Sequence, residues 1–154
     1  MEQLESFSTI QNAIPQDFCD YIRNTFKSKA LYTPRGRWKA YTVDKGSYFD
    51  EIADTFNEYI PENYTISWIN ITQYLPNRGL RMHKDEKSQR TIVCDISEPY
   101  IGGSFKIDKD TYINTTKGDI IIFDGSNVLH GVDEVIKGVR VSLNLWTHKI
   151  MTNI

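Results

Sequence analysis

Two of the three histidines stand where they could share a metal ion with a carboxylate. His83 and Asp85 are two positions apart, and residues i and i+2 of an extended chain project from the same face. His130 comes later, behind the apolar run at 120–123 and a short loop. Two imidazoles and one carboxylate make the facial triad that binds non-haem Fe(II) and leaves positions open for other ligands. We therefore expect His83, Asp85 and His130 to converge on one cation.

A second group of polar residues lies on one face of the predicted strand 139–146. In a strand the side chains alternate between two faces, so an apolar row opposes a row of Arg140, Ser142, Asn144 and Trp146. A turn over 131–137 would return this strand beside His130, and Arg140 could then lie deeper in the same cavity. A guanidinium offers a planar fork for a carboxylate, and Ser142 would add a donor. The polar row is thus either exposed to solvent or lines a polar cavity with a carboxylate-binding end.

In this order the motifs resemble the Fe(II)/2-oxoglutarate-dependent dioxygenases, most closely the prolyl 4-hydroxylase-like group. The resemblance covers about residues 64–147. It rests on one ordered set: Tyr74, His83-x-Asp85, Gly102-Gly103, Gly118-Asp119-x-x-x-Phe123, Leu129-His130-x-Val132 and Gly138-x-Arg140-x-Ser142-Leu143-x-Leu145-Trp146.

The resemblance implies a double-stranded β-helix, a cofactor set and a reaction. His83, Asp85 and His130 would hold Fe(II), and Arg140, with Ser142 close by, would pair with the distal carboxylate of 2-oxoglutarate. Tyr74 would reach toward the co-substrate or the iron, although a core aromatic suits the same position. The reaction would use O2, with ascorbate as an additional reductant, release succinate and CO2, and hydroxylate a C–H bond. A prolyl residue of a peptide or protein would be the substrate.

One position departs from the family pattern. Asp95 falls near the place where many prolyl hydroxylases carry a tyrosine that helps to bind the distal carboxylate. Two carboxylates facing one another repel. We therefore expect either that Asp95 points outward or that Thr91, or another residue, supplies the hydroxyl.

The substrate side of the site is less defined by sequence. The segment 31–47 contains proline and glycine and predicts a long loop or loose hairpin that could act as a lid, with Arg35, Arg37 and Trp38, together with Trp146, as lid or substrate contacts. Basic residues gather at 27–39 and 78–90, and they could hold a nucleic acid, an acidic peptide or only solvent. The alternatives are the same chemistry on a nucleic acid, a free amino acid or another small molecule, or a metal-binding β-barrel module without turnover.

The elements that must position these residues can be read from the periodicity of apolar residues. Helical stripes are predicted after Pro15 (Phe18, Tyr21, Ile22, Thr25, Phe26) and over 48–56, and short strands follow at 64–74, 91–97, 104–107, 111–115, 119–123 and 139–146. We expect an α+β protein, mainly β with N-terminal helices. It would be a jelly roll with two helices packed on one sheet, formed by residues 1–154 as a single domain.

Composition narrows the class of protein. The chain has 154 residues, a formal net charge of −2 and only two cysteines, which argues against a general nucleic-acid binder and a disulfide scaffold. No apolar run predicts a membrane span, and the first residues do not predict a secretory signal. These features favour a cytoplasmic protein with no membrane partner. The oligomeric state does not follow from the sequence.

Overall fold

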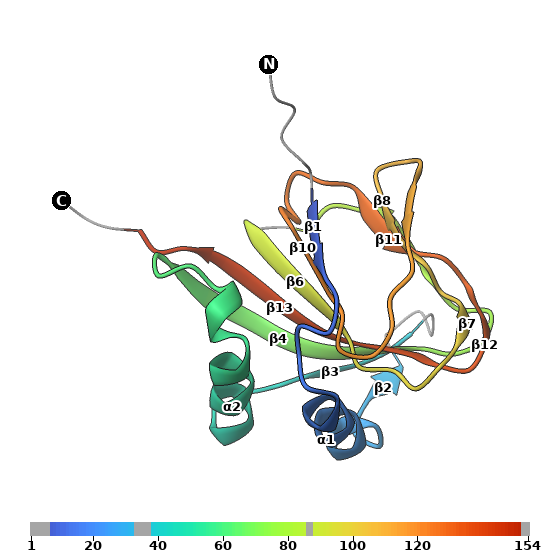
Figure 1. Ribbon diagram of the computed structural model, residues 1–154, viewed down its shortest axis with the longest axis horizontal. Helices are drawn as coiled ribbons and strands as arrows, with labels where there is room; N and C mark the ends of the chain where they lie inside the picture. The colour runs from blue at the N-terminus through green and yellow to red at the C-terminus, as the bar shows by residue number, and fades with distance from the viewer. Residues whose placement is uncertain (1–6, 33–37, 86–87, 152–154) are drawn as a thin grey trace.

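The computed structural model describes residues 7–32, 38–85 and 88–151. Two antiparallel sheets face one another, and a pair of short strands extends one end (Figure 1). The large sheet has the order β1 (Phe7–Ile10), β10 (Ile120–Phe123), β6 (Arg90–Asp95), β13 (Arg140–Lys149), β4 (Tyr64–Tyr74), β3 (Lys39–Thr42) and β2 (Leu31–Tyr32). The small sheet has the order β5 (Leu80–His83), β11 (His130–Val132), β8 (Phe105–Ile107) and β9 (Thr111–Ile113), and the pair is β12 (Val135–Lys137) with β7 (Ile101–Gly102).

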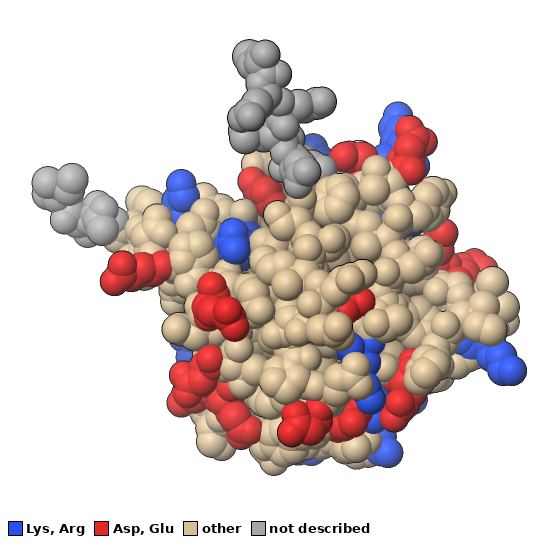
Figure 2. All heavy atoms as spheres, in the orientation of Figure 1, with Lys and Arg blue, Asp and Glu red and all other residues tan. Residues whose placement is uncertain are grey.

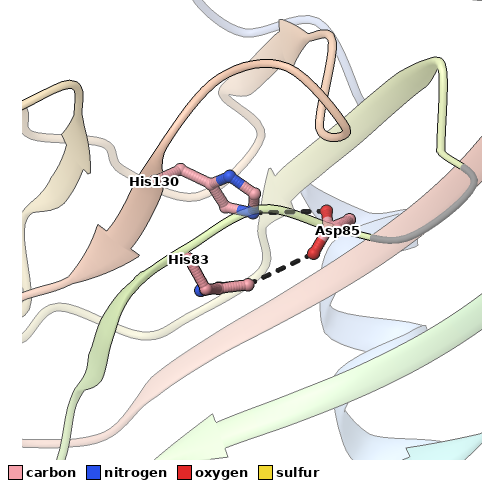
Figure 3. Close-up of side chains that lie close together, drawn as sticks. All are labelled: His83, Asp85 and His130. Carbon is pink, nitrogen blue, oxygen red and sulfur yellow. Dashed lines mark hydrogen bonds and ion pairs between the residues drawn. The ribbon is translucent and has the colours of Figure 1, made fainter.

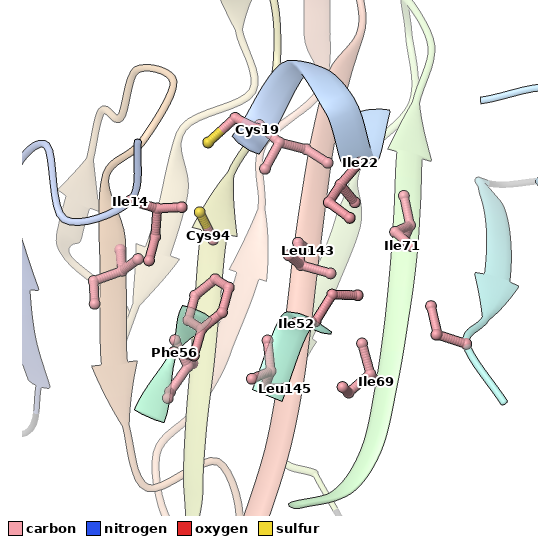
Figure 4. Close-up of a cluster of buried hydrophobic side chains, with 14 of the residues drawn as sticks. Ile14, Cys19, Ile22, Ile52, Phe56, Ile69, Ile71, Cys94, Leu143 and Leu145 are labelled. Carbon is pink, nitrogen blue, oxygen red and sulfur yellow. The ribbon is translucent and has the colours of Figure 1, made fainter. Parts of the chain in front are cut away.

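Two helices cover the outer face of the large sheet, as the sequence predicts. They are α1 (Gln16–Phe26) and α2 (Ser47–Thr55), and a 3-10 turn η1 (Asn57–Tyr59) follows α2. Figure 4 shows their apolar side chains packed on those of β4, β6 and β13. Tyr21 belongs to the predicted stripe of α1 but is 40% exposed, because its ring lies at the edge beside Tyr48 and its hydroxyl donates to Glu51.

A second core fills the space between the sheets. Phe105, Ile107 and Val132 of the small sheet contact Ile121 and Phe123 of β10 there. Strand β13 follows the predicted alternation: Leu143 and Leu145 face the helices, whereas Ser142 and Asn144 face the small sheet. This face carries polar side chains inside the molecule, so it lines a cavity rather than the surface. The fold is the predicted α+β jelly roll.

The predicted turn over 131–137 is wrong. This segment forms part of β11 and all of β12, and β13 then returns in the opposite sheet rather than beside β11. His130, Gly131 and Val132 are buried, so their backbone groups need strand partners, which β5 and β8 provide. His130 and Arg140 therefore belong to facing sheets rather than to adjacent strands.

The hairpin alternative holds for the described parts of segment 31–47. Strand β2 pairs with β3, and β3 pairs with β4 at the edge of the large sheet. Arg35 and Arg37 lie outside the described residues. None of the helices in the described ranges is long and apolar enough to cross a membrane.

Candidate active site

A β-bulge places the first histidine. His83 pairs with His130, but Val132 pairs with Leu80, so β5 holds one residue more than β11 over this stretch. The bulge turns the Arg81 carbonyl toward the imidazole, and His83 Nδ1 lies 3.0 Å from that oxygen. Gly131 makes the close approach of the strands feasible, because a Cβ there would stand 2.5 Å from the Leu80 carbonyl oxygen.

A hydrogen bond to a backbone carbonyl orients each of the two histidines. His130 Nδ1 lies 2.8 Å from the Val128 carbonyl oxygen, which like Arg81 is two residues earlier in the chain. A carbonyl only accepts, so each Nδ1 carries a proton, and Nε2 is the ring nitrogen left to bind a metal. Without a metal, a protonated Nε2 donates to Asp85. The two Nε2 atoms each lie 3.2 Å from a different oxygen of Asp85 (Figure 3). One ligand atom from each of the three residues falls within 4.8 Å of the others, so the predicted trio does converge.

Asp85 is fixed from three directions. Its backbone N–H donates to the Gly125 carbonyl at 2.7 Å, and the indole Nε1 of Trp146 donates to Oδ2 at 3.0 Å. Gly125 leaves room for the carboxylate, because a Cβ there would stand 2.6 Å from Asp85 Oδ2. Burial alone would raise the pKa of Asp85, but the bonds from His130, His83 and Trp146 outweigh it and hold the pKa well below its usual range. The Asp85 carboxylate in turn raises the pKa of His83.

The donor set fits a divalent iron. Two imidazole nitrogens with fixed tautomers and one ionised carboxylate are the facial arrangement that non-haem Fe(II) takes. The backbone carbonyls behind the two rings are the outer partners that orient metal-bound histidines.

The trio stands at one end of a cavity of about 350 Å³ between the two sheets. Its floor comes from the inward faces of β4 and β13, and its opposite wall from β5, β8 and β11. The polar lining residues of the floor are Asn70, Thr72, Tyr74, Ser142 and Asn144, with Trp146 beside the metal ligands.

Arg140 lies two residues before Ser142 on the same face of β13 and pairs with Tyr74 of β4. It is completely buried and is not itself among the lining residues of the cavity. Its Nη1 donates to the Tyr100 hydroxyl, to the Gly103 carbonyl at 3.1 Å and to Thr115 Oγ1 at 3.2 Å. Among the described residues its Nε and Nη2 have no partner. A buried guanidinium edge without acceptors is costly, and two oxygens of a carboxylate would satisfy it.

Asp95 does not point outward. It is 1% exposed and lies on the cavity side of β6, the side that also carries Thr91 and Val93. Its carboxylate is instead neutralised locally. It accepts from the Ser97 N–H at 2.9 Å, the Tyr100 hydroxyl at 2.8 Å and the Thr115 hydroxyl at 2.7 Å, and lies 3.8 Å from Arg140.

The structure does not bring Thr91 to the Arg140 end. Thr91 pairs with Trp146, whose indole bonds Asp85, whereas Asp95 pairs with Ser142, and the Thr91 hydroxyl bonds Ser88 at 2.6 Å. The hydroxyls that contact the Arg140 guanidinium belong to Tyr100 and Thr115. The sequence pattern does not single out these two residues. Tyr100 lies between two strands, and Thr115 lies beyond the end of β9, which stops at Ile113 although the predicted strand runs to 115.

Three further predicted residues lie at the cavity. Tyr74 lines it and is also part of the core between the sheets, so both interpretations of this tyrosine fit its position. Trp38 lines it too, with its ring 6.4 Å from that of Tyr74, and Trp146 flanks the metal ligands. The basic cluster at 78–90 is divided: Arg81 lines the cavity, whereas Arg90 donates to the Tyr59 carbonyl at 3.0 Å on the helix side.

Comparison with known structures shows the same architecture. A viral collagen prolyl hydroxylase from Paramecium bursaria Chlorella virus-1, solved with 2-oxoglutarate, superposes with a TM-score of 0.76 at 18% identity, over 96% of this chain and 97% of that one. A Trichoplax adhaerens prolyl hydroxylase, solved with a hypoxia-inducible-factor peptide, gives 0.72 at 14% identity, over 94% and 84%. HygX from Streptomyces hygroscopicus, with nickel, 2-oxoglutarate and hygromycin B bound, gives 0.74 at 10% identity, over 96% and 84%.

The sequence itself matches a family model. No curated protein matches the sequence. The model described as the 2OG-Fe(II) oxygenase superfamily matches residues 69–148, more than half of the chain, and this range holds all three predicted metal ligands and Arg140. The resemblance drawn from the motifs is thereby confirmed. The chain belongs to the 2OG-Fe(II) oxygenase superfamily and is a dioxygenase.

Proposed function

We propose that this dioxygenase hydroxylates a C–H bond of a peptide or protein, with a prolyl residue as the target. His83, Asp85 and His130 hold Fe(II), and the Nε–Nη2 edge of Arg140 binds the distal carboxylate of 2-oxoglutarate. The observation that carries the proposal is one cavity with a facial ligand set at one end. Beyond the other end lies a buried guanidinium edge that finds no partner in the described part of the chain. A binding module without turnover would have no need for that second feature.

Some residues of the chain bind the metal and the co-substrate, and others exclude water from the cavity. Bound iron, together with 2-oxoglutarate and O2, supplies the oxidant, and succinate and CO2 leave. Fixed Nδ1–H bonds keep both imidazoles ready to ligate, and Trp146 holds the carboxylate of Asp85. Apolar side chains of Val93, Phe105 and Phe123 line the cavity and limit water near the reacting centre. Ser142, two residues from Arg140 on the same face of β13, lines the cavity.

A peptide is favoured over the alternative substrates by two observations. Prolyl hydroxylases share this fold over nearly the whole chain, one of them with a peptide bound. Acidic side chains gather over the surface formed by α1 and α2 in the view of Figure 2, and Arg90 of the basic cluster lies on the helix side rather than at the cavity, which does not favour a nucleic-acid strand. HygX shows that the same fold can also hold a small molecule.

Succinate release in the presence of Fe(II) and 2-oxoglutarate tests the proposal, with proline-containing peptides, free amino acids and oligonucleotides as candidate substrates. We expect release that depends on a prolyl peptide, and a mass gain of one oxygen on its proline. His83→Ala should abolish release, whereas His148→Ala, which changes a histidine outside the site, should not. Release driven only by oligonucleotides or amino acids would replace the peptide assignment, and undiminished release by His83→Ala would overturn the metal site.

A further inference from the structure

The Arg140 guanidinium is held on one side only. Its Nη1 contacts three acceptors, Tyr100 Oη, the Gly103 carbonyl and Thr115 Oγ1, while Nε and Nη2 have no partner among the described residues. Three of the five N–H donors of this completely buried side chain lie on the Nε–Nη2 edge, so the bonds of Nη1 orient the guanidinium. The groups that contact Nη1 therefore decide where the open edge points.

Behind those acceptors lies a carboxylate. The hydroxyls of Tyr100 and Thr115 both reach Oδ2 of Asp95, at 2.8 and 2.7 Å, and Oδ1 of Asp95 accepts the Ser97 N–H. The Asp95 and Arg140 side chains are fully buried, and their nearest charged atoms are 3.8 Å apart. Asp95 and Arg140 are therefore linked mainly through the hydroxyl groups of Tyr100 and Thr115 rather than by a direct hydrogen bond.

The direction of these bonds is fixed by chemistry. An ionised carboxylate has no proton to donate, and a guanidinium has no lone pair to accept with. Tyr100 and Thr115 must therefore donate to Asp95 and accept from Arg140. Burial raises the pKa of Tyr100, so its hydroxyl keeps the proton that this arrangement needs.

We propose that Asp95, acting through Tyr100 and Thr115, is a positioning device that aims the Nε–Nη2 edge of Arg140 at the co-substrate carboxylate. The inference rests on the proposed function and adds three residues to it. Because both hydroxyl protons are committed to Asp95, neither hydroxyl donates to the co-substrate. Tyr100 and Thr115 act on 2-oxoglutarate only through the guanidinium, and Asp95 faces the Arg140 side that the co-substrate does not use.

The positioning role can be tested by measuring how tightly 2-oxoglutarate binds to the anaerobic Fe(II)-loaded chain. Its visible charge-transfer absorption reports the binding. Tyr100→Phe and Thr115→Val each remove one bridging hydroxyl and keep the size of the side chain. We expect each to raise the dissociation constant of 2-oxoglutarate roughly tenfold, the effect of one hydrogen bond to a charged group. Iron affinity and the kcat for succinate at saturating 2-oxoglutarate should stay near the values of the unmodified chain.

Two controls keep the test decisive. Thr115→Ser retains the hydroxyl and should restore binding, which a purely steric role of Thr115 would not predict. Tyr112→Phe changes a tyrosine that is 55% exposed on β9 and should leave binding unchanged. If the unmodified chain binds 2-oxoglutarate and both hydroxyl-deleting variants bind it within twofold, the positioning device is wrong and the proposed function stands. If the unmodified chain does not bind 2-oxoglutarate, the proposed function fails.

Discussion

At the residue scale, backbone groups that no residue spacing reveals orient the proposed metal ligands. The H-x-D spacing and the later histidine predict the trio, and the trio converges. The carbonyls of Arg81 and Val128, which set the tautomers, take part only because a bulge and a loop turn them toward the rings. The orientation of Asp95 does not follow from its place in the sequence, because it depends on Tyr100 and Thr115 from other segments.

Gly125 provides a test of how tightly Asp85 is held. A methyl group at this position would overlap Thr91 Oγ1 and stand 2.6 Å from Asp85 Oδ2, so the carboxylate must shift. Changes in the outer partners of metal ligands commonly lower metal affinity ~10- to 100-fold, and we expect Gly125→Ala to do so. Titration with Mn(II) or Co(II) measures this. Ser126→Ala, whose side chain bonds Asp124 rather than Asp85, is the matched control, and equal affinities of the two variants would contradict the prediction.

At the element scale, β13 joins the helix-side core to the cavity floor. Its length makes the period of two visible in the sequence, so both of its faces could be predicted. Strands β1, β5, β7 and β12 have only two to four residues, too few for any period to show, and they owe their structure to pairing with longer neighbours. Strands β11 and β12 are also too short to show a period, so the sequence of 131–137 predicts a turn instead of strands.

Truncation of two adjacent residues of β13 should lower stability to different extents. Leu143 is fully buried among the side chains that α1 and α2 cover, so Leu143→Ala should lower the free energy of unfolding by ~2–5 kcal/mol. Asn144 faces the cavity and donates to Asn70 at 2.9 Å and Thr72 at 3.2 Å, so Asn144→Ala should cost only about 1 kcal/mol. Urea denaturation of the metal-free chain compares the two. A similar loss for both would mean that the cavity face contributes to the core as the helix face does.

At the scale of the whole molecule, the fold brings the titratable groups of His83 and Asp85 together at the proposed metal site. In the metal-free chain the bond to Asp85 raises the pKa of His83 above its ordinary 6.5, and the bonds from His130, His83 and Trp146 lower the pKa of Asp85 below 3.8 despite its burial. The stability from the protonated His83 is fully present below pH 6.5 and is lost as the pH rises through the raised pKa. The stability from the ionised Asp85 is present above pH 3.8 and is lost as the pH falls through the lowered pKa.

Metal binding should therefore reverse the pH dependence of the chain's stability at pH values above the raised pKa of His83. A cation needs His83 unprotonated, so a bound metal stabilises more as the pH rises past the raised pKa of His83, where the metal-free chain loses the His83–Asp85 pair. At a free metal concentration 100 times the dissociation constant the gain is about 2.7 kcal/mol. Melting temperatures of the metal-free and Mn(II)-loaded chain between pH 5 and 8 should diverge with rising pH. His83→Gln should remove both the divergence and the alkaline loss, and a gap that stays constant with pH in the unmodified chain would show that protons and metal do not compete at His83.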